Sequence, residues 1–294
     1  MPRPALSASR SMEIVDFLAA FPDRAFTLSE IARAAKINVA SCHAVLHALT
    51  ARGYVARSAS GKSYRLGPAL VAIGQAALNS QPLIQRAQEA ARELSRELGI
   101  PVLLTTLAGD DILAVAAVTS PSGKSASMRV GQRLPLVPPI GAPFLAWSSQ
   151  AAIESWIARM APPGNRKFVE EWRQDLALVR KRGYQVTLRT ANSSSVATLM
   201  ADMAANRKAP EYKDRAIAQI HAWDERIFHP KSIDAKENYL VALIAAPIFD
   251  HNAGAVFCLC LVGFPEKING RKIKAYADRL TQVCLDVMGN DRTS

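Results

Sequence analysis

The chain has 294 residues, long enough for two domains that each bury a core of their own. Hydrophobic residues make up 49% of it and charged residues 21%, with no biased tract, which excludes a fibrous or intrinsically disordered protein. The formal net charge of +11 indicates a polyanionic partner, of which nucleic acid is the commonest. Residues 1–80 carry nine Lys and Arg against four acidic residues, whereas residues 81–294 carry 27 against 21, so positive charge is densest in the N-terminal quarter.

A winged helix-turn-helix is the first structure that the sequence predicts. A helix is expected over 9–20. The capping box Thr27-Leu28-Ser29-Glu30 then starts a second helix, and 36–38 form a turn. A third helix is expected over 40–52. Its buried face combines small and branched apolar side chains at helical spacing: Cys42, Val45, Leu46 and Leu49.

The wing of this module is expected directly after the third helix. Gly53 is a suitable C-terminal stop for a helix. Extended runs at 54–57 and 63–66 follow, joined by a turn-rich segment, which is the pattern of a β-hairpin. A module of this kind inserts its third helix into the major groove of DNA.

The rest of the chain reads as a connecting helix followed by an α+β domain with a mainly antiparallel sheet flanked by helices. We expect the winged helix-turn-helix at 7–67, a linker helix at 68–81, and the second domain at 82–294 with an atypical insertion at 190–237. Within the second domain, helices are expected at 83–98, 151–160, 167–182 and 270–288, and strands at 102–107, 112–119, 125–129, 184–189, 239–248 and 255–262. A Pro-rich elbow occupies 134–143.

Membrane and secreted proteins fit the sequence poorly. The longest apolar runs, 239–249 and 254–264, are about half as long as a membrane-spanning helix. The four cysteines lie in apolar periodic segments with no secretion signal before them. We therefore expect reduced, buried thiols in a cytoplasmic protein. The Cys258-Leu259-Cys260 pair is compatible with metal or redox chemistry, but buried small side chains are its commoner meaning.

The sequence lacks the catalytic motifs G-x-S-x-G, H-E-x-x-H and G-x-G-x-x-G. Two Gly-Lys-Ser triplets, at 61–63 and 123–125, lack the earlier glycine of a nucleotide-binding loop. We therefore expect no enzyme activity, no cofactor and no bound metal ion.

Four segments carry a resemblance to a known family: ARGYVARSASGKSYRLGPAL, GQRLPLVPPIGAPFLAW, LVRKRGYQV and LIAAPIFD. With these segments in this order, the chain resembles the IclR-type bacterial transcription regulators over nearly its full length. The resemblance implies an N-terminal DNA-binding domain, a linker helix and a C-terminal effector-binding domain related to the GAF fold. It also implies a homodimer or homotetramer on a palindromic operator in double-stranded DNA, with no membrane association.

The candidate DNA contacts lie on the helix-turn-helix and its wing. They are polar, basic or histidine side chains: Thr27, Ser29, Lys36, Asn38, Ser41, His43, His47, Arg52, Arg57, Lys62, Tyr64 and Arg65. Ala44 stands where the family commonly has a basic residue. The alternatives are a solvated helix face and a metal-binding pair formed by His43 and His47, which has no nearby carboxylate or thiol partner.

The candidate ligand site follows from the resemblance. It nominates apolar or weakly polar residues of the elbow and of two late strands: Leu136, Gly141, Ala142, Leu243, Cys260 and Val262. The alternative is that each simply packs in the core of the sheet. Ala142 replaces the family's Lys, and Cys260 and Val262 replace residues that are often serine. A small apolar or aromatic effector is therefore favoured over a small, highly polar carboxylate.

Two functions from different classes remain open at this stage. The first is a ligand-responsive regulator that binds operator DNA. The second is a small-molecule sensor or enzyme domain that uses its helix-turn-helix only for protein interaction.

Overall fold

The computed structural model describes residues 5–19, 21–126, 128–160, 166–188, 230–264 and 266–289. These residues fall into two compact units, the first ending at Pro82 and the second beginning at Leu83. Most of the expected insertion at 190–237 lies outside the described residues.

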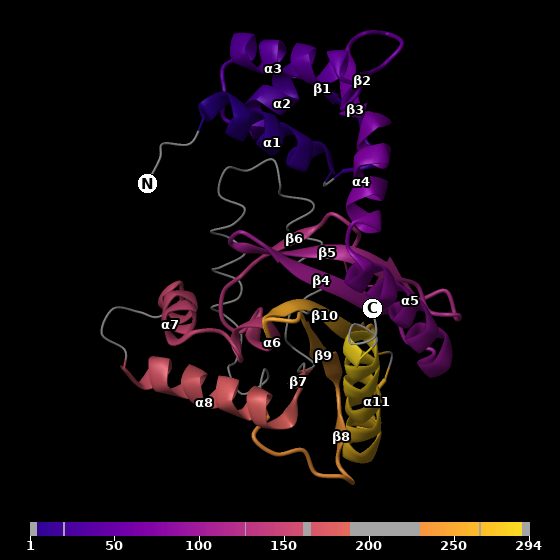
Figure 1. The fold of residues 1–294 in the computed structure, drawn as a ribbon, viewed down its shortest axis with the longest axis vertical. Helices are drawn as coiled ribbons and strands as arrows, with labels where there is room; N and C mark the ends of the chain where they lie inside the picture. Colours follow the sequence, from indigo (N-terminus) through magenta and orange to yellow (C-terminus); the bar gives the residue numbers. More distant parts are fainter. Residues whose placement is uncertain are drawn as a thin grey trace. The chain divides into compact units, whose positions relative to one another are not determined.

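The first unit is a three-helix bundle with a small sheet and a following helix (Figure 1). Its elements are α1 (Leu6–Ala19), β1 (Phe26–Thr27), α2 (Leu28–Ala34), α3 (Val39–Ala51), β2 (Val55–Arg57), β3 (Ser63–Leu66) and α4 (Ala69–Asn79). Ile14 of α1, Ile31 of α2 and Leu46 of α3 are fully buried and meet in one core. The helical spacing of these apolar residues is what brings the three helices together.

The capping box at the start of α2 has the predicted geometry. The Thr27 hydroxyl accepts a hydrogen bond from the Glu30 backbone N–H at 3.3 Å, and the Glu30 carboxylate accepts one from the Thr27 N–H at 2.9 Å. Gly53, after α3, adopts φ +69°, as a left-handed helix stop requires.

The wing has one strand more than the predicted hairpin. β1 pairs with β3, with Phe26 opposite Tyr64, so the sheet order is β1-β3-β2. A two-residue strand directly before a helix cap has no alternating pattern of its own. Its pairing comes from the burial of Phe26 against Phe17 and Phe21.

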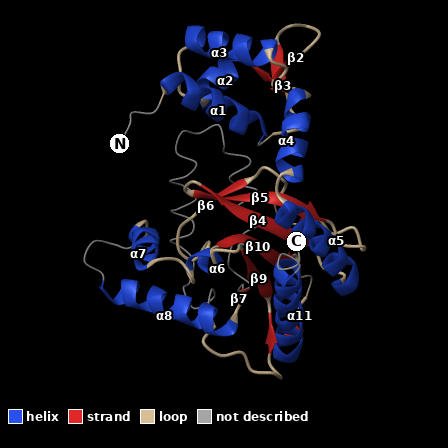
Figure 2. Cartoon of the chain, viewed as in Figure 1, coloured by secondary structure: helices blue, strands red, loops and turns tan. Residues whose placement is uncertain are grey.

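The second unit is built on a six-stranded sheet in the order β6-β5-β4-β10-β9-β7, in which every pair is antiparallel (Figure 2). Its strands are β4 (Val102–Ala108), β5 (Asp111–Val118), β6 (Arg133–Pro135), β7 (Gln185–Leu188), β9 (Val241–Phe249) and β10 (Ala255–Val262). A separate pair is formed by β8 (Asn238–Tyr239) and β11 (Ile268–Asn269). The mixed α+β class with a mainly antiparallel sheet is confirmed.

Helices cover both faces of this sheet. They are α5 (Pro82–Leu98), α6 (Ala142–Leu145), α7 (Gln150–Ala158), α8 (Arg166–Arg182) and α11 (Gly270–Gly289). In Figure 2, α5 and α11 lie on one side and α6, α7 and α8 on the other. The Arg279 guanidinium of α11 joins the Glu97 carboxylate of α5 through two hydrogen bonds of 2.7 Å each.

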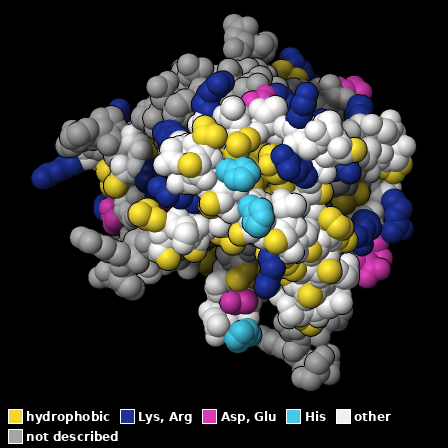
Figure 3. Space-filling view, turned by 90° about the horizontal axis from the view of Figure 1, so that it is seen from above, with side chains coloured by type: hydrophobic (Ala, Val, Ile, Leu, Met, Phe, Trp, Pro, Cys, Tyr) yellow, Lys and Arg dark blue, Asp and Glu magenta, His cyan; other side chains and the backbone are white. Residues whose placement is uncertain are grey.

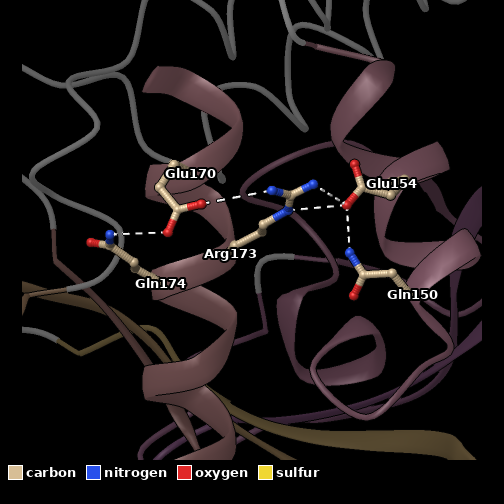
Figure 4. Close-up of polar contacts among 5 residues, drawn as sticks. All are labelled: Gln150, Glu154, Glu170, Arg173 and Gln174. Carbon is tan, nitrogen blue, oxygen red and sulfur yellow. Dashed lines mark hydrogen bonds and ion pairs between the residues drawn. The ribbon is translucent and has the colours of Figure 1, made fainter. Parts of the chain in front are cut away.

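A polar network links α7 to α8 (Figure 4). The Arg173 guanidinium donates to the Glu154 carboxylate and also approaches Glu170 at 3.7 Å. Gln150 donates to the same oxygen of Glu154. Because these side chains are largely solvated, we expect the network to orient the two helices more than to stabilise them.

The strand predicted at 125–129 is wrong. The sheet instead takes Arg133–Pro135 as its edge strand, with Leu134 opposite Ile112. Two glycines with positive φ, Gly123 and Gly131, turn the intervening chain. The Arg129 N–H is bonded to the Gln132 side chain rather than to a neighbouring strand. Local turns therefore override the extended propensity of this segment.

Within the described part of the chain, no helix is both long enough and apolar enough to cross a membrane.

We predict that Leu46→Ala destabilises the protein by about 2–5 kcal/mol, because it leaves a cavity in the fully buried core of the first unit. The neighbouring exposed change His47→Ala should cost less than about 0.5 kcal/mol. Urea unfolding followed by circular dichroism measures both. Equal losses would mean that Leu46 does not anchor α3.

Candidate nucleic-acid interface and ligand cavity

The third helix of the first unit, α3, has one buried and one exposed face. Cys42, Leu46 and Leu49 point into the core, whereas His43, Ala44 and His47 are exposed. Lys36 at φ +52° makes the tight turn that separates α2 from α3. The Asn38 side chain caps α3 by accepting a hydrogen bond from the Ser41 N–H at 2.7 Å. The sequence thus fixes both where α3 starts and which of its faces stays free.

The free face of α3 is small, polar and weakly basic in character. Figure 3 shows two neighbouring histidines at the surface, with Lys and Arg side chains on either side of them. Alanines at 40, 44 and 48 are exposed, so no bulky side chain keeps a partner away from the helix backbone. Such a surface can approach base edges closely.

The basic side chains predicted for phosphate contact are exposed on the helix end and the wing: Arg52, Arg57, Lys62 and Arg65. The Arg57 guanidinium lies 5.6 Å from the centre of the Tyr64 ring. Tyr64 itself is buried in the core of the first unit, which places it as a support for Arg57.

The remaining candidates on the helix-turn-helix differ in how free their polar groups are. Ser29 is exposed, and Ser41 is partly buried in the first turn of α3. The Thr27 hydroxyl and the Asn38 side chain are engaged in helix caps. Thr27 and Asn38 therefore position α2 and α3, and their caps use the acceptors that a DNA contact would need.

A cavity of about 100 Å³ lies between one face of the large sheet and the elbow that ends in α6. Its walls come from β4, β5, β7, β9 and β10, and its roof includes Pro139, Ile140 and Phe144. Of the six predicted ligand-site residues, Gly141, Leu243, Cys260 and Val262 line it. Leu136 and Ala142 do not line it. Ala142 is fully buried in α6, and Leu136 packs against Gly141.

Two thiols of β10 face the cavity together. The sulfur atoms of Cys258 and Cys260 are 3.8 Å apart, because alternate residues of a strand share a face. Burial raises the pKa of the Cys258 thiol well above its usual value. The Cys258 thiol is therefore an uncharged, weakly polar part of the wall. Within the described residues, no group of three or more His, Cys, Asp or Glu side chains is arranged to hold a metal ion.

Three polar residues of the cavity were missed by sequence reasoning: Thr105 of β4 and Gln185 and Thr187 of β7. All three are buried. The alternation Gln-Val-Thr-Leu in β7 indicates that Gln185 and Thr187 share one face of the strand. The sequence does not show that this face lines a cavity.

We predict that Gly141→Ala costs about 1–3 kcal/mol and deforms the elbow. Gly141 has φ +99°, and a Cβ there would lie 2.2 Å from the Leu136 Cδ1 atom. Gly109→Ala is the matched control, because Gly109 has φ +63° but open space around it. Thermal unfolding should show a clearly larger loss for Gly141→Ala. A loss no larger than that of the control would contradict the proposed close contact.

Comparison with known proteins places the chain in a family. The model of the IclR helix-turn-helix domain matches residues 7–59, and that of the bacterial transcriptional regulator IclR C-terminal matches residues 75–205. The Pca regulon regulatory protein of Pseudomonas putida is 33% identical over 132 residues, which is 44% of this chain and 44% of that protein. The aligned part thus spans less than half of that relative.

Solved structures share the fold along nearly the whole chain. An IclR transcriptional regulator from Alicyclobacillus acidocaldarius superimposes with a TM-score of 0.71 at 19% identity, covering 98% of this chain and 99% of the other. An IclR homologue from Microbacterium hydrocarbonoxydans, solved with 4-hydroxybenzoate, gives 0.66 at 19% identity, covering 98% and 100%. With both of its characteristic parts matched, the chain belongs to the IclR family of bacterial transcriptional regulators.

Proposed function

We propose that the chain is a ligand-responsive transcriptional regulator that binds a palindromic operator in double-stranded DNA. The observation that carries this proposal is the exposed face of α3, formed by His43, Ala44 and His47, while the opposite face of the helix is buried in the core. Exposed basic side chains at the end of α3 and on the wing provide for phosphate contact beside it. In this proposal Ser41, His43 and His47 read bases, and Arg52, Arg57, Lys62 and Arg65 hold the backbone.

The proposal includes a homodimer or a homotetramer. The helix α4 has no buried residue, and its Val71 and Ile73 are 75% and 47% exposed. A second copy of the chain that covers these side chains would pair two recognition helices, about one DNA turn (roughly 34 Å) or a multiple of it apart. Such an assembly matches a palindromic operator. A regulator of this kind works in the cytoplasm, where the DNA is.

The effector in this proposal is a small apolar or aromatic metabolite that occupies the cavity of the second unit. Most of the cavity lining is apolar, as is usual for a small-molecule site. The structural neighbour solved with 4-hydroxybenzoate supports a single aromatic ring as the ligand type, and we carry over the ring and not the carboxylate of that ligand. The ligand acts by binding one arrangement of the regulator more tightly than another.

We predict different effects for wing residues and for residues of α3. Arg57→Gln and Lys62→Gln should each weaken binding to every DNA sequence and lower the salt slope by about one, because one phosphate contact is lost. Ser41→Ala and His43→Ala should instead reduce the preference for the operator over random DNA by roughly 5–100-fold. Gel shifts over a salt series measure both quantities.

Fragments upstream of the protein's own gene are the first DNA to test. Lys267→Gln, an exposed change in the second unit, is the matched control and should leave binding unchanged. If all four variants lose affinity equally for operator and random DNA, this division of roles is wrong. If the unaltered protein binds all fragments only weakly and without preference, the helix-turn-helix serves another purpose, such as protein interaction.

A further inference from the structure

The cavity of the second unit has a polar end. Gln185 and Thr187 project from β7 into a space whose other walls are mostly apolar, although both side chains are at least 96% buried. The Gln185 amide donates a hydrogen bond to the Thr187 hydroxyl oxygen at 3.0 Å. Buried polar groups in a protein interior almost always have hydrogen-bond partners. The pair therefore needs an explanation.

The Gln185–Thr187 hydrogen bond uses only part of what the two side chains offer. It takes one N–H of the amide and one lone pair of the hydroxyl. Among the described residues, the Gln185 amide oxygen and the Thr187 hydroxyl proton have no further partner. With respect to the described residues, one acceptor and one donor thus remain at the same end of the cavity, where a ligand hydroxyl or carbonyl group can bond to them.

The strand register places this polar end beside apolar rows. Gln185 is opposite Ala245, which is opposite Cys260, and Cys260 is opposite Leu103. Thr187 is likewise followed across the sheet by Leu243 and Val262. A ligand with its polar group at β7 would therefore lay its apolar body along these rows.

The lining also limits the charge of the ligand. None of the described residues that line the cavity carries a formal charge. A buried carboxylate with no cation to pair it is strongly disfavoured, whereas a neutral hydroxyl needs only hydrogen bonds. Thr105, the other polar residue of the wall, donates to the Cys258 carbonyl at 3.4 Å and adds no charge.

The volume limits the size. A water-sized group needs about 10–15 Å³ of such space, so a cavity of about 100 Å³ holds on the order of ten non-hydrogen atoms. That is one ring with one or two small substituents.

From these observations we infer that the effector is an uncharged single-ring compound whose hydroxyl or carbonyl group bonds to Gln185 and Thr187. This inference rests on the proposed function, because it names the ligand class of the same regulatory site. It assigns ligand selection to two residues of β7 rather than to the elbow.

Three probes that differ in one substituent test the inference on the full chain at pH 7: toluene, 4-methylphenol and 4-methylbenzoate. Ligand-observed NMR titrations give their dissociation constants. We expect 4-methylphenol to bind at least about five-fold more tightly than toluene, because each of its two hydrogen bonds is worth about 1 kcal/mol. We expect 4-methylbenzoate to bind at least about ten-fold more weakly than 4-methylphenol, because its charge is not paired.

Two substitutions test whether the preference for 4-methylphenol over toluene depends on β7. Gln185→Met removes the amide at similar volume, and Thr187→Val removes the hydroxyl. Each should lower the preference for 4-methylphenol over toluene by about five-fold, because each removes one hydrogen bond to the ligand. Thr281→Val is the matched control, because the Thr281 hydroxyl is bonded to the Ala277 carbonyl within α11, outside the cavity. It should leave the preference for 4-methylphenol unchanged. If Gln185→Met does not fold by circular dichroism, the nearly isosteric Thr187→Val carries the comparison.

Equal or tighter binding of 4-methylbenzoate overturns the inference, as does a phenol preference that survives both β7 substitutions. Failure of all three probes to bind also counts against it. Gel shifts without ligand are run in parallel, so that the two proposals fail separately. Specific DNA binding without probe binding refutes the ligand class and leaves the regulator standing. Probe binding without specific DNA binding refutes the regulator proposal and leaves the ligand class of the cavity standing.

Discussion

The alternation of side chains across the antiparallel sheet is the constraint on which the second unit depends. In β10, Cys258, Cys260 and Val262 face the cavity, while Leu259 and Leu261 are fully buried. The next strands repeat the division at the same register, because Ala245 is opposite Cys260 and Ala246 is opposite Leu259. The Cys284 thiol of α11 reaches the Ala246 carbonyl, so the helix covers that second face. A shift of one residue would exchange the two faces and remove the cavity.

The first unit depends on the same principle with a helical period. Cys42, Leu46 and Leu49 fill one side of α3, so His43, Ala44 and His47 must lie on the other. The buried face supplies stability, and the exposed face is free to meet a partner, which in our proposal is DNA. This separation explains why the recognition side can be small and nearly uncharged without weakening the fold. In the proposed function, the electrostatic part of DNA binding therefore falls to the basic residues at the end of α3 and on the wing.

Sequence patterns predicted the structure correctly where the contacts join residues that are close in sequence. The Thr27–Glu30 capping box and the helix stop at Gly53 involve only residues close in sequence, and both could be predicted. The β1 strand could not, because its pairing with β3 depends on the burial of Phe26 beneath aromatic neighbours. The edge strand was predicted at 125–129, before its observed position in β6, for a related reason. Turns at Gly123 and Gly131, together with the Gln132 side chain, decide where the chain rejoins the sheet.

The two candidate sites also differ in how far local sequence patterns could identify their residues. The exposed face of α3 follows from helical periodicity alone, so its residues were found from the sequence. Leu243, Cys260 and Val262 came from family resemblance, and the structure places them in the cavity wall. Gln185 and Thr187 were missed because their neighbours are Ala245 and Leu243, about sixty residues further along the chain. No local pattern identifies a cavity that distant strands form together.

We propose that occupancy of the cavity and binding of DNA are coupled in one molecule. The most direct test measures the dissociation constant of the full chain for an operator fragment with and without a saturating cavity ligand. We expect DNA affinity to change by about 5–150-fold, with an equal change in ligand affinity when DNA is present. DNA affinity that stays the same while the ligand fills the cavity would contradict it.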